Sequence, residues 1–210
     1  LYNPATVGDV RQVVAPPYDI IDATLQKTLH DRHPNNVIRL ELGYEQPGDT
    51  TSDNKYLRAA GALKEWLKSG ALRRDDKPAI YYHTIEYQPP YSAPGTPTKV
   101  FKGFLSTVEL EEFGSGKIYP HENTRAAAKT DRFNLLEACR ANFSAIISLY
   151  SDPQNDVLTL IERSIASDKP RIDFQDDVGF RQRLWSVTDP AVLAKVVEIM
   201  HTKQLFIADG

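Results

Sequence analysis

Two alternating segments separated by a proline-rich stretch place the strongest constraint on the fold. Residues 78–87 and 99–110 are rich in β-branched and aromatic residues, which is typical of β-strands. The stretch between them, "QPPYSAPGTPT", carries four prolines, which lack the N–H group that a strand needs. The pattern predicts a long antiparallel hairpin with an exposed tip. It argues against a strictly doubly wound parallel sheet.

The rest of the chain alternates between expected helices and expected strands. Helices are predicted with Asp22 and the pair Asp189–Pro190 at two of the N-termini, and with Gly70 as a stop. The helical ranges are 22–31, 56–69, 132–141, 156–166 and 191–201, and further strands are expected at 35–42, 143–151, 171–176, 183–188 and 204–210. The strands at 143–151 and 204–210 are expected to be buried. The fold class is therefore mixed α/β (α+β): a mixed sheet with flanking helices, in a single domain over residues 1–210.

Charge and composition narrow the classes of partner. The 210 residues carry a net charge of −3, and the cations are scattered. A DNA-binding surface needs a broad basic stripe, so DNA is an unfavoured partner and any anion site must be local. No stretch approaches the twenty or so apolar residues that cross a bilayer, so no membrane contact is expected.

The number of cysteines predicts the cellular location, and the N-terminal residues bear on whether the chain is a fragment. Cys139 is the only cysteine, which excludes an intramolecular disulfide and favours a reducing, cytoplasmic location. Its helical position favours a place in the core over a role as nucleophile. The chain begins with neither a methionine nor a signal-peptide pattern, so we expect trimming or a fragment of a longer protein.

The segment "KIYPHENTRAAAKTDRFNLL" concentrates chemistry-bearing side chains ahead of a helix. His121 and Glu122 suggest a zinc-protease motif, but Arg125 stands where the second histidine is required, so the zinc interpretation fails. A His–Glu pair can instead perform acid–base work, because histidine titrates near neutrality and a carboxylate orients it. The alternative is a solvated loop whose next residues cap the helix.

Three cations follow at helical spacing. Arg125, Lys129 and Arg132 are separated by four and three residues, so one helical face can present all of them. They form either an exposed charged face, with Asp131 as an ion-pair partner, or an anion clamp for phosphate or carboxylate. Their position at a helix start favours the clamp, because the N-terminal N–H groups also attract anions. The sequence contains no Walker loop, GxGxxG or GxSxG motif.

Four stretches together carry a family resemblance. They are, in chain order, "VVAPPYDIID", "RHPNNVIRLEL", "YPHENTRAAAKTDRFNLLEACRANFSAIISLYS" and "FIADG". Over essentially the whole chain they resemble the bacterial and archaeal domain of unknown function 1015 family, which has no established activity. In that family the terminal Asp-Gly is followed by two histidines, an arginine and a helix, so the chain looks like an N-terminal portion. That element is similar to a box in ParB and sulfiredoxin-like domains.

The resemblance implies a phosphate site made from two distant segments. We expect His121, Glu122 and Asp209 to be catalytic, and Arg125, Lys129, Arg132 and Gly210 to bind phosphate. Magnesium is a possible cofactor, with Glu122, Asp131 or Asp209 as its oxygen ligands. The expected function is phosphoryl transfer or hydrolysis on a phosphorylated small molecule or nucleotide. The alternative is a ParB-like regulatory module in which nucleotide binding controls DNA or partner contact.

Overall fold

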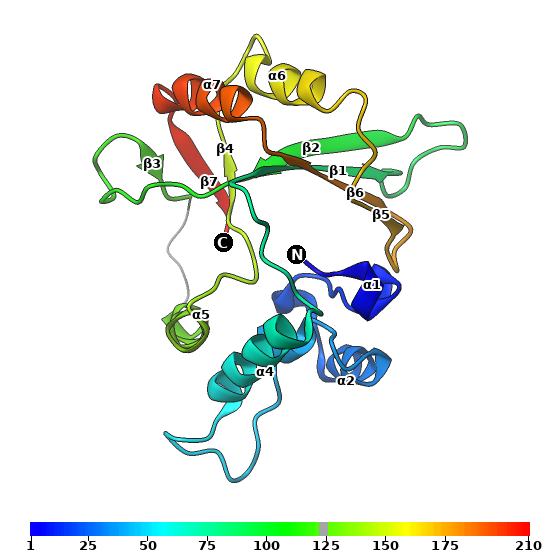
Figure 1. The fold of residues 1–210 in the computed structure, drawn as a ribbon, viewed down its shortest axis with the longest axis vertical. Coiled ribbons are helices and arrows are strands. Elements are labelled where there is room, and N and C mark those ends of the chain that lie inside the picture. Colours follow the sequence, from blue (N-terminus) through cyan, green and yellow to red (C-terminus); the bar gives the residue numbers. More distant parts are fainter. Residues whose placement is uncertain (122–125) are drawn as a thin grey trace. The chain divides into compact units, whose positions relative to one another are not determined.

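The computed structural model describes residues 1–121 and 126–210. Contacts among them group into two compact units, each built from two separate stretches. The first unit combines Leu1–Arg74 with the stretch that ends at Ala145, and the second combines Asp75–His121 with Ile146–Gly210. The first is helical and the second contains the sheets (Figure 1). The single domain over 1–210 stays a prediction, and each unit is described by itself.

Short and long helices of the first unit surround one apolar cluster. Its helices are α1 (Pro4–Val7), α2 (Ala23–Arg32), α3 (Ile38–Glu41), α4 (Lys55–Ser69) and α5 (Ala126–Cys139), with 3-10 turns at Val10–Gln12 and Tyr18–Ile20. The cluster consists of the buried side chains of Val7, Val13, Leu40, Trp66 and Ala71. Helix α4 supplies its largest member, Trp66, from the face opposite to Lys64 and Lys68.

Two predicted helix ends are confirmed in detail. The Asp22 carboxylate accepts a hydrogen bond from the backbone N–H of Leu25 at 2.8 Å, so it caps α2. Gly70 follows α4 with a φ of 79°, the left-handed conformation that a glycine adopts without steric cost.

The strand predicted over 35–42 is wrong, because this segment folds into the short helix α3. Asn36, which is fully buried, donates from its side-chain amide to the carbonyls of Gln12 and Val14 at 2.8 and 2.9 Å. Its side-chain oxygen accepts from the backbone N–H of Ile38 at 3.0 Å. These side-chain bonds satisfy backbone groups that a strand would have paired, and they start a helical turn instead.

The predicted hairpin is confirmed in the second unit. Strands β1 (Ile80–Tyr87) and β2 (Lys99–Leu105) pair antiparallel with Tyr87 opposite Lys99. Strand β2 ends five residues earlier than predicted. With β5 (Ile172–Gln175) and β6 (Arg181–Val187) they form a four-stranded antiparallel sheet in the order β2-β1-β6-β5.

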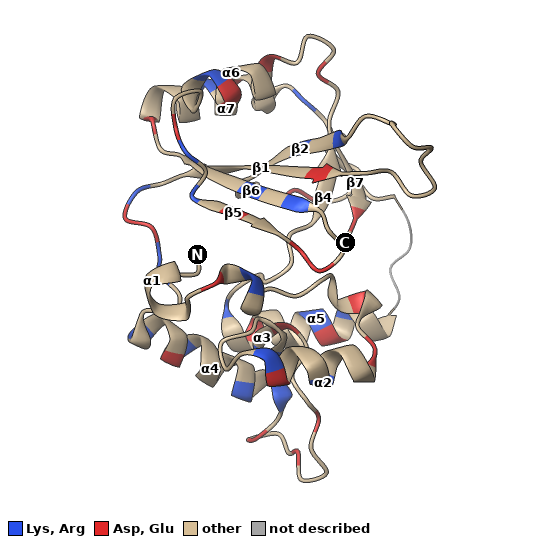
Figure 2. Ribbon diagram, turned by 90° about the vertical axis from the view of Figure 1, so that its right-hand side faces the viewer, with Lys and Arg blue, Asp and Glu red and all other residues tan. Residues whose placement is uncertain are grey.

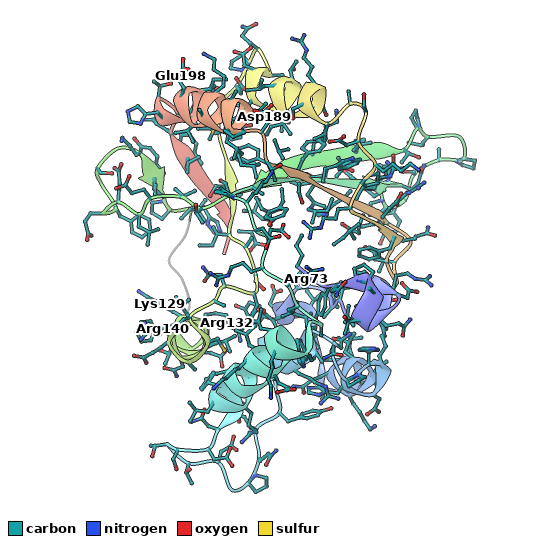
Figure 3. All side chains as sticks on the ribbon, in the orientation of Figure 1. Arg73, Lys129, Arg132, Arg140, Asp189 and Glu198 are labelled. Atoms are coloured by element: carbon teal, nitrogen blue, oxygen red, sulfur yellow. The ribbon has the colours of Figure 1, made fainter. Side chains whose placement is uncertain are left out.

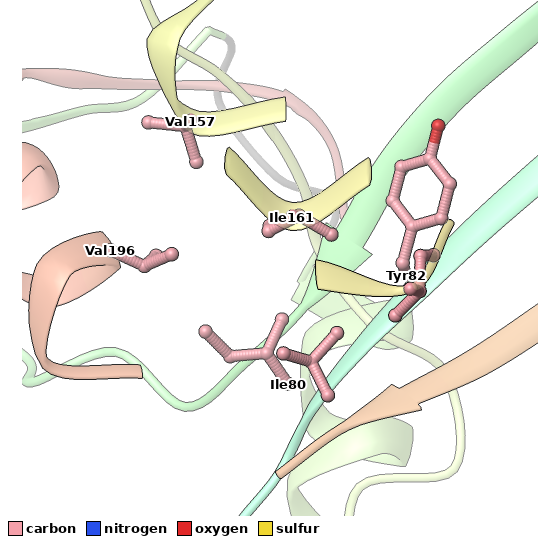
Figure 4. Close-up of a cluster of buried hydrophobic side chains, with 7 residues drawn as sticks. Ile80, Tyr82, Val157, Ile161 and Val196 are labelled. Atoms are coloured by element: carbon pink, nitrogen blue, oxygen red, sulfur yellow. The ribbon is translucent and has the colours of Figure 1, made fainter. Parts of the chain in front are cut away.

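Two helices cover one face of this sheet (Figure 1). They are α6 (Asp156–Ser164) and α7 (Pro190–His201), and the Asp189 carboxylate caps α7 by accepting from the N–H of Ala191 at 2.8 Å. Figure 4 shows Ile80 and Tyr82 of β1 meeting Val157, Ile161 and Val196 of the two helices. Alternate residues of β1 therefore build this core.

A second, three-stranded sheet is mixed, as the fold class requires. Its order is β3 (Ile118–Tyr119), β7 (Leu205–Asp209), β4 (Ile147–Leu149); β3 runs parallel and β4 antiparallel to β7. The predicted burial of the strands at 143–151 and 204–210 is wrong, because Leu149 is 56% exposed and Phe206 44% exposed. Phe206 stacks on Tyr119 with ring centroids 5.1 Å apart. Alternating exposure along β7 shows that only one face of this sheet is covered.

Among the described residues, no helix combines the length and the apolar character needed to cross a membrane.

Candidate functional site

The predicted site residues fall into three groups. His121, Asp209 and Gly210 belong to the second unit, and Lys129 and Arg132 lie on α5 of the first. Two further members of the predicted site, Glu122 and Arg125, lie outside the described residues. Each described group is therefore considered within its own unit.

The edge of the small sheet brings two distant segments together. Tyr119 of β3 is the parallel partner of Phe206 of β7, and the N–H of Leu205 donates to the carbonyl of Lys117 at 2.8 Å. His121 follows two residues after Tyr119, and Asp209 three residues after Phe206. Parallel strands end at the same edge of their sheet. The chain therefore leaves β3 toward His121 at the edge where β7 delivers Asp209, and both residues are exposed.

Gly210 adopts a positive φ of 119°. A Cβ atom added there would lie 3.0 Å from Cγ1 of Ile146 and 3.3 Å from its Cα. Both the conformation and the close approach favour glycine at the end of β7.

Helix α5 presents Lys129 and Arg132 in different surroundings (Figure 3). Lys129 is exposed and has no ion-pair partner within the described part of the chain. Arg132 is three-quarters buried and donates to the Glu41 side chain at 2.7 Å and to the Glu41 carbonyl at 3.1 Å. Its Nε donates to Asp131 at 3.0 Å, and its guanidinium lies 4.1 Å from the centre of the Tyr18 ring.

These contacts belong to a larger polar network in the first unit. Glu41, only 6% exposed, also accepts a hydrogen bond from the Ser144 hydroxyl at 2.7 Å. Asp131 accepts from the Tyr56 hydroxyl and from the Lys55 ammonium, each at 2.8 Å. The network thus joins Tyr18 of "APPYD", Glu41 of "VIRLEL", and Asp131, Arg132 and Ser144 of the long third stretch. Three of the four stretches that carry the family resemblance meet here.

The network favours the charged forms of Asp131 and Lys55. Burial opposes ionisation of Asp131, but hydrogen bonds from Lys55, Arg132 and Tyr56 outweigh it and lower the pKa of this carboxyl to about 2. Burial likewise opposes the charge on Lys55, yet Asp131 and Glu45 raise its pKa above the ordinary value. Lys55 and Arg132 thus both contact Asp131, and Arg132 also contacts Glu41.

A small pocket opens beside the network. It is lined by Leu40, Glu41, Leu42, Gly43, Lys55, Tyr56, Arg132 and Leu135. The sequence pattern pointed to Asp131 and Arg132 as an ion-pair alternative, but not to Glu41, Lys55, Tyr56 or Ser144. The only signal for Glu41 was a glutamate between two leucines in "RLEL".

The proposed magnesium ligands differ in their fit. The oxygens of Asp131 already accept from Lys55, Tyr56 and Arg132, so this carboxylate does not fit a metal ligand. Among the described residues, no group of three or more histidine, cysteine or acidic side chains is arranged to hold an ion. Magnesium at Asp209 or Glu122 stays a prediction.

Comparison with known proteins identifies the family. A family model described as "Protein of unknown function (DUF1015)" matches residues 1–210. No curated protein and no solved structure gives a significant match. The likeness of Asp209–Gly210 to ParB domains stays a prediction. The chain, matched over its whole length by this model, belongs to the DUF1015 family.

Proposed function

We propose that the chain binds a phosphorylated small molecule or nucleotide at the edge of the small sheet and transfers or hydrolyses its phosphoryl group. The parallel pairing of β3 with β7 supports this best, because it directs His121 and Asp209 to one edge. Carboxyl ends of parallel strands commonly carry ligand sites.

Each residue has a definite part in the proposal. His121 moves the proton of the attacking or leaving oxygen, because a histidine side chain can both accept and donate a proton. Asp209 orients or accepts a proton beside it, and the backbone at Gly210 approaches the phosphate. Lys129 and Arg132 keep their predicted role as phosphate-binding cations, and Arg132 binds a phosphate only by giving up Glu41 or Asp131. Glu122 and Arg125 keep their predicted roles outside the described residues.

A cytoplasmic setting is part of the same proposal, because Cys139 is the only cysteine and a reducing compartment suits it. The DNA-binding alternative receives less support. Lysine, arginine and acidic residues are interspersed along α4 and α5 (Figure 2), and the net charge is −3. DNA-binding surfaces need cations gathered on one face.

Turnover of candidate compounds tests the proposal. Phosphate release and phosphoryl transfer are followed by ³¹P NMR with a panel of nucleotides and phosphorylated metabolites. His121→Ala and Asp209→Asn should each reduce turnover by about a hundredfold or more, the usual scale for a lost proton-transfer group. His201→Ala, an exposed histidine at the end of α7, is the matched control and should keep full activity.

Two results contradict the proposal. One is turnover that His121→Ala and Asp209→Asn leave unchanged. The other is a thermal-shift screen in which no phosphorylated compound stabilises the protein, although a ligand at a hundred times its Kd should contribute about 2.7 kcal/mol. Stabilisation by a nucleotide without turnover, together with retention of DNA, would favour the ParB-like alternative.

A further inference from the structure

His83 lies on the face of the four-stranded sheet that is opposite to α6 and α7. Ile80 and Tyr82 of β1 point toward the two helices, and successive side chains of a strand point to opposite faces. On the His83 face, Ile85 comes next along β1, and Leu184 is the partner of His83 on β6. His83 is therefore a half-buried polar ring with apolar neighbours.

Two hydrogen bonds in series determine which ring nitrogen of His83 carries the proton. The side-chain N–H of Gln182 donates to Asp176 at 2.8 Å, because a carboxylate only accepts. The Gln182 oxygen lies 2.9 Å from Nε2 of His83 and accepts from it. Asp176 is itself held in the turn between β5 and β6, where it accepts from the N–H groups of Val178 and Phe180. Neutral His83 thus carries its proton on Nε2, which leaves Nδ1 as an acceptor.

This acceptor is available to a ligand. Nδ1 of His83 forms no hydrogen bond with any residue that the structure describes. Burial lowers the pKa of His83 more than the Gln182 hydrogen bond raises it, so the imidazole is neutral near neutral pH. A neutral ring nitrogen without a proton attracts an N–H or O–H group.

The position opposite His83 on β2 carries no side chain, because it is Gly103. Among the described residues, a Cβ atom added there would meet Phe101, whose Cε1 atom would be 3.7 Å away. Phe101 lies two residues earlier on the same face and is 45% exposed. An aromatic ring beside an unfilled position offers a planar ligand a surface on which to stack.

We propose that His83 and Phe101, with the unfilled position at Gly103, bind the nucleobase of a free nucleoside or nucleotide. A nucleobase combines a planar ring, which stacks on Phe101, with an edge N–H group, which donates to Nδ1 of His83. The site requires no phosphoryl group, so it goes beyond the function proposed above.

A free small molecule fits this sheet better than a strand of nucleic acid. A strand needs unpaired cations along its phosphates. Three cations of the sheet are already paired with carboxylates: Lys102 with Glu162, Arg181 with Asp173, and Arg183 with Glu86.

Nucleosides without phosphate test this site separately from the phosphoryl chemistry of His121 and Asp209. Adenosine, guanosine, cytidine and uridine are titrated at neutral pH into ¹⁵N-labelled protein, and NMR of the histidine rings reports the tautomer. We expect the Nε2–H tautomer for His83. At least one nucleoside should bind with a Kd of about 0.1 mM, an affinity typical of a ligand of roughly 20 non-hydrogen atoms.

Three variants should weaken the binding of that nucleoside by about tenfold or more. His83→Phe keeps a ring but removes the acceptor, and Phe101→Ala removes the stacking surface. Gly103→Val fills the open position with a residue that suits a strand, so its loss of binding is separable from a loss of folding. His201→Phe and Phe113→Ala are the matched controls, since both residues are exposed in the same unit, and they should leave the Kd unchanged.

Gln182→Leu tests its positioning role, because the Nδ1–H tautomer of His83 should then appear and the affinity should fall. The proposal would be overturned if no nucleoside shifted the NMR signals at roughly 5 mM, about fifty times the expected Kd. A Kd that His83→Phe and Gly103→Val leave unchanged, or an Nδ1–H tautomer in the unmodified chain, would contradict it equally. So would a single-stranded oligonucleotide of about ten bases that binds about tenfold more tightly than any nucleoside.

Discussion

Removing Arg132 should destabilise the first unit far more than removing its neighbour Lys129. In Arg132→Met the apolar stem keeps its packing, while Glu41 and Asp131 lose the guanidinium that satisfies them. Breaking a buried ion pair from one side typically costs about 3–5 kcal/mol. Glu41 is only 7% exposed at its side chain, which places it in this class.

Contacts that remain in the variant reduce the expected loss of stability. Ser144 still donates to Glu41, and Lys55 and Tyr56 still hold Asp131. We therefore expect a loss of about 2–4 kcal/mol, corresponding to roughly 4–16 °C in Tm for a chain of this size. Lys129→Met, at an exposed position of the same helix, should stay within about 0.5 kcal/mol.

Urea unfolding followed by circular dichroism and tryptophan fluorescence measures both variants, and Trp66 in the first unit's core reports on the relevant region. Adding Glu41→Gln to Arg132→Met should cost less than the two single changes summed, by about 1–3 kcal/mol, because the two residues share one interaction. Equal stability of Arg132→Met and Lys129→Met would show that the network contributes nothing. Strict additivity would show that the pair is not coupled.

The pH dependence of stability and the loss of a buried side-chain amide give two further predictions. A carboxyl whose pKa is lower in the folded state than in the unfolded state stabilises the folded state at pH values above the unfolded pKa. Asp131 should therefore contribute about 2 kcal/mol of stability above pH 3.8, the ordinary pKa of its carboxyl. This contribution should fade as the pH falls toward about 2. Urea midpoints across this range should fall less steeply in Asp131→Asn, and parallel profiles would contradict the assignment. Asn36→Ala should cost about 2–4 kcal/mol, because it removes the fully buried Asn36 amide and its hydrogen bonds to the carbonyls of Gln12 and Val14. The same unfolding assay checks it against Asn35→Ala, and equal losses would refute the role of the Asn36 side chain.

Local signals predicted local structure well. Asp22, Gly70 and Asp189 mark helix ends because a cap needs only residues within one turn. The hairpin was predictable because its strands are neighbours in sequence and its tip cannot pair. Strand β3, with only two residues, carries too little pattern to be recognised.

Contacts between residues far apart in the sequence determine the features that the sequence did not predict. Alternating apolar residues in "VIRLEL" are equally compatible with a strand, and the buried bonds of Asn36 to Gln12 and Val14 select a helix. Glu41 can be buried because Arg132, 91 residues later in the chain, forms an ion pair with it. No sequence pattern near either residue predicts that pairing. At the candidate site, sequence alone placed chemistry at His121 and at Asp209, and the parallel β3–β7 pairing supplies the geometry that relates the two strands.

The interleaving of the two units has a consequence for synthesis on the ribosome. The first unit needs α5, and the second needs α6, α7 and β7, so neither has its full set of elements when only the first 121 residues have emerged. The Arg132–Glu41 contact closes a loop of 91 residues, with a chain-entropy cost of about 4 kcal/mol that local helix formation does not repay. Until α5 has been synthesised, Glu41 lacks its ion pair with Arg132. The buried members of the apolar cluster all precede Arg74 and are synthesised early, whereas the polar network around Glu41 is completed only with α5. Chaperone binding should therefore continue until α5 has emerged.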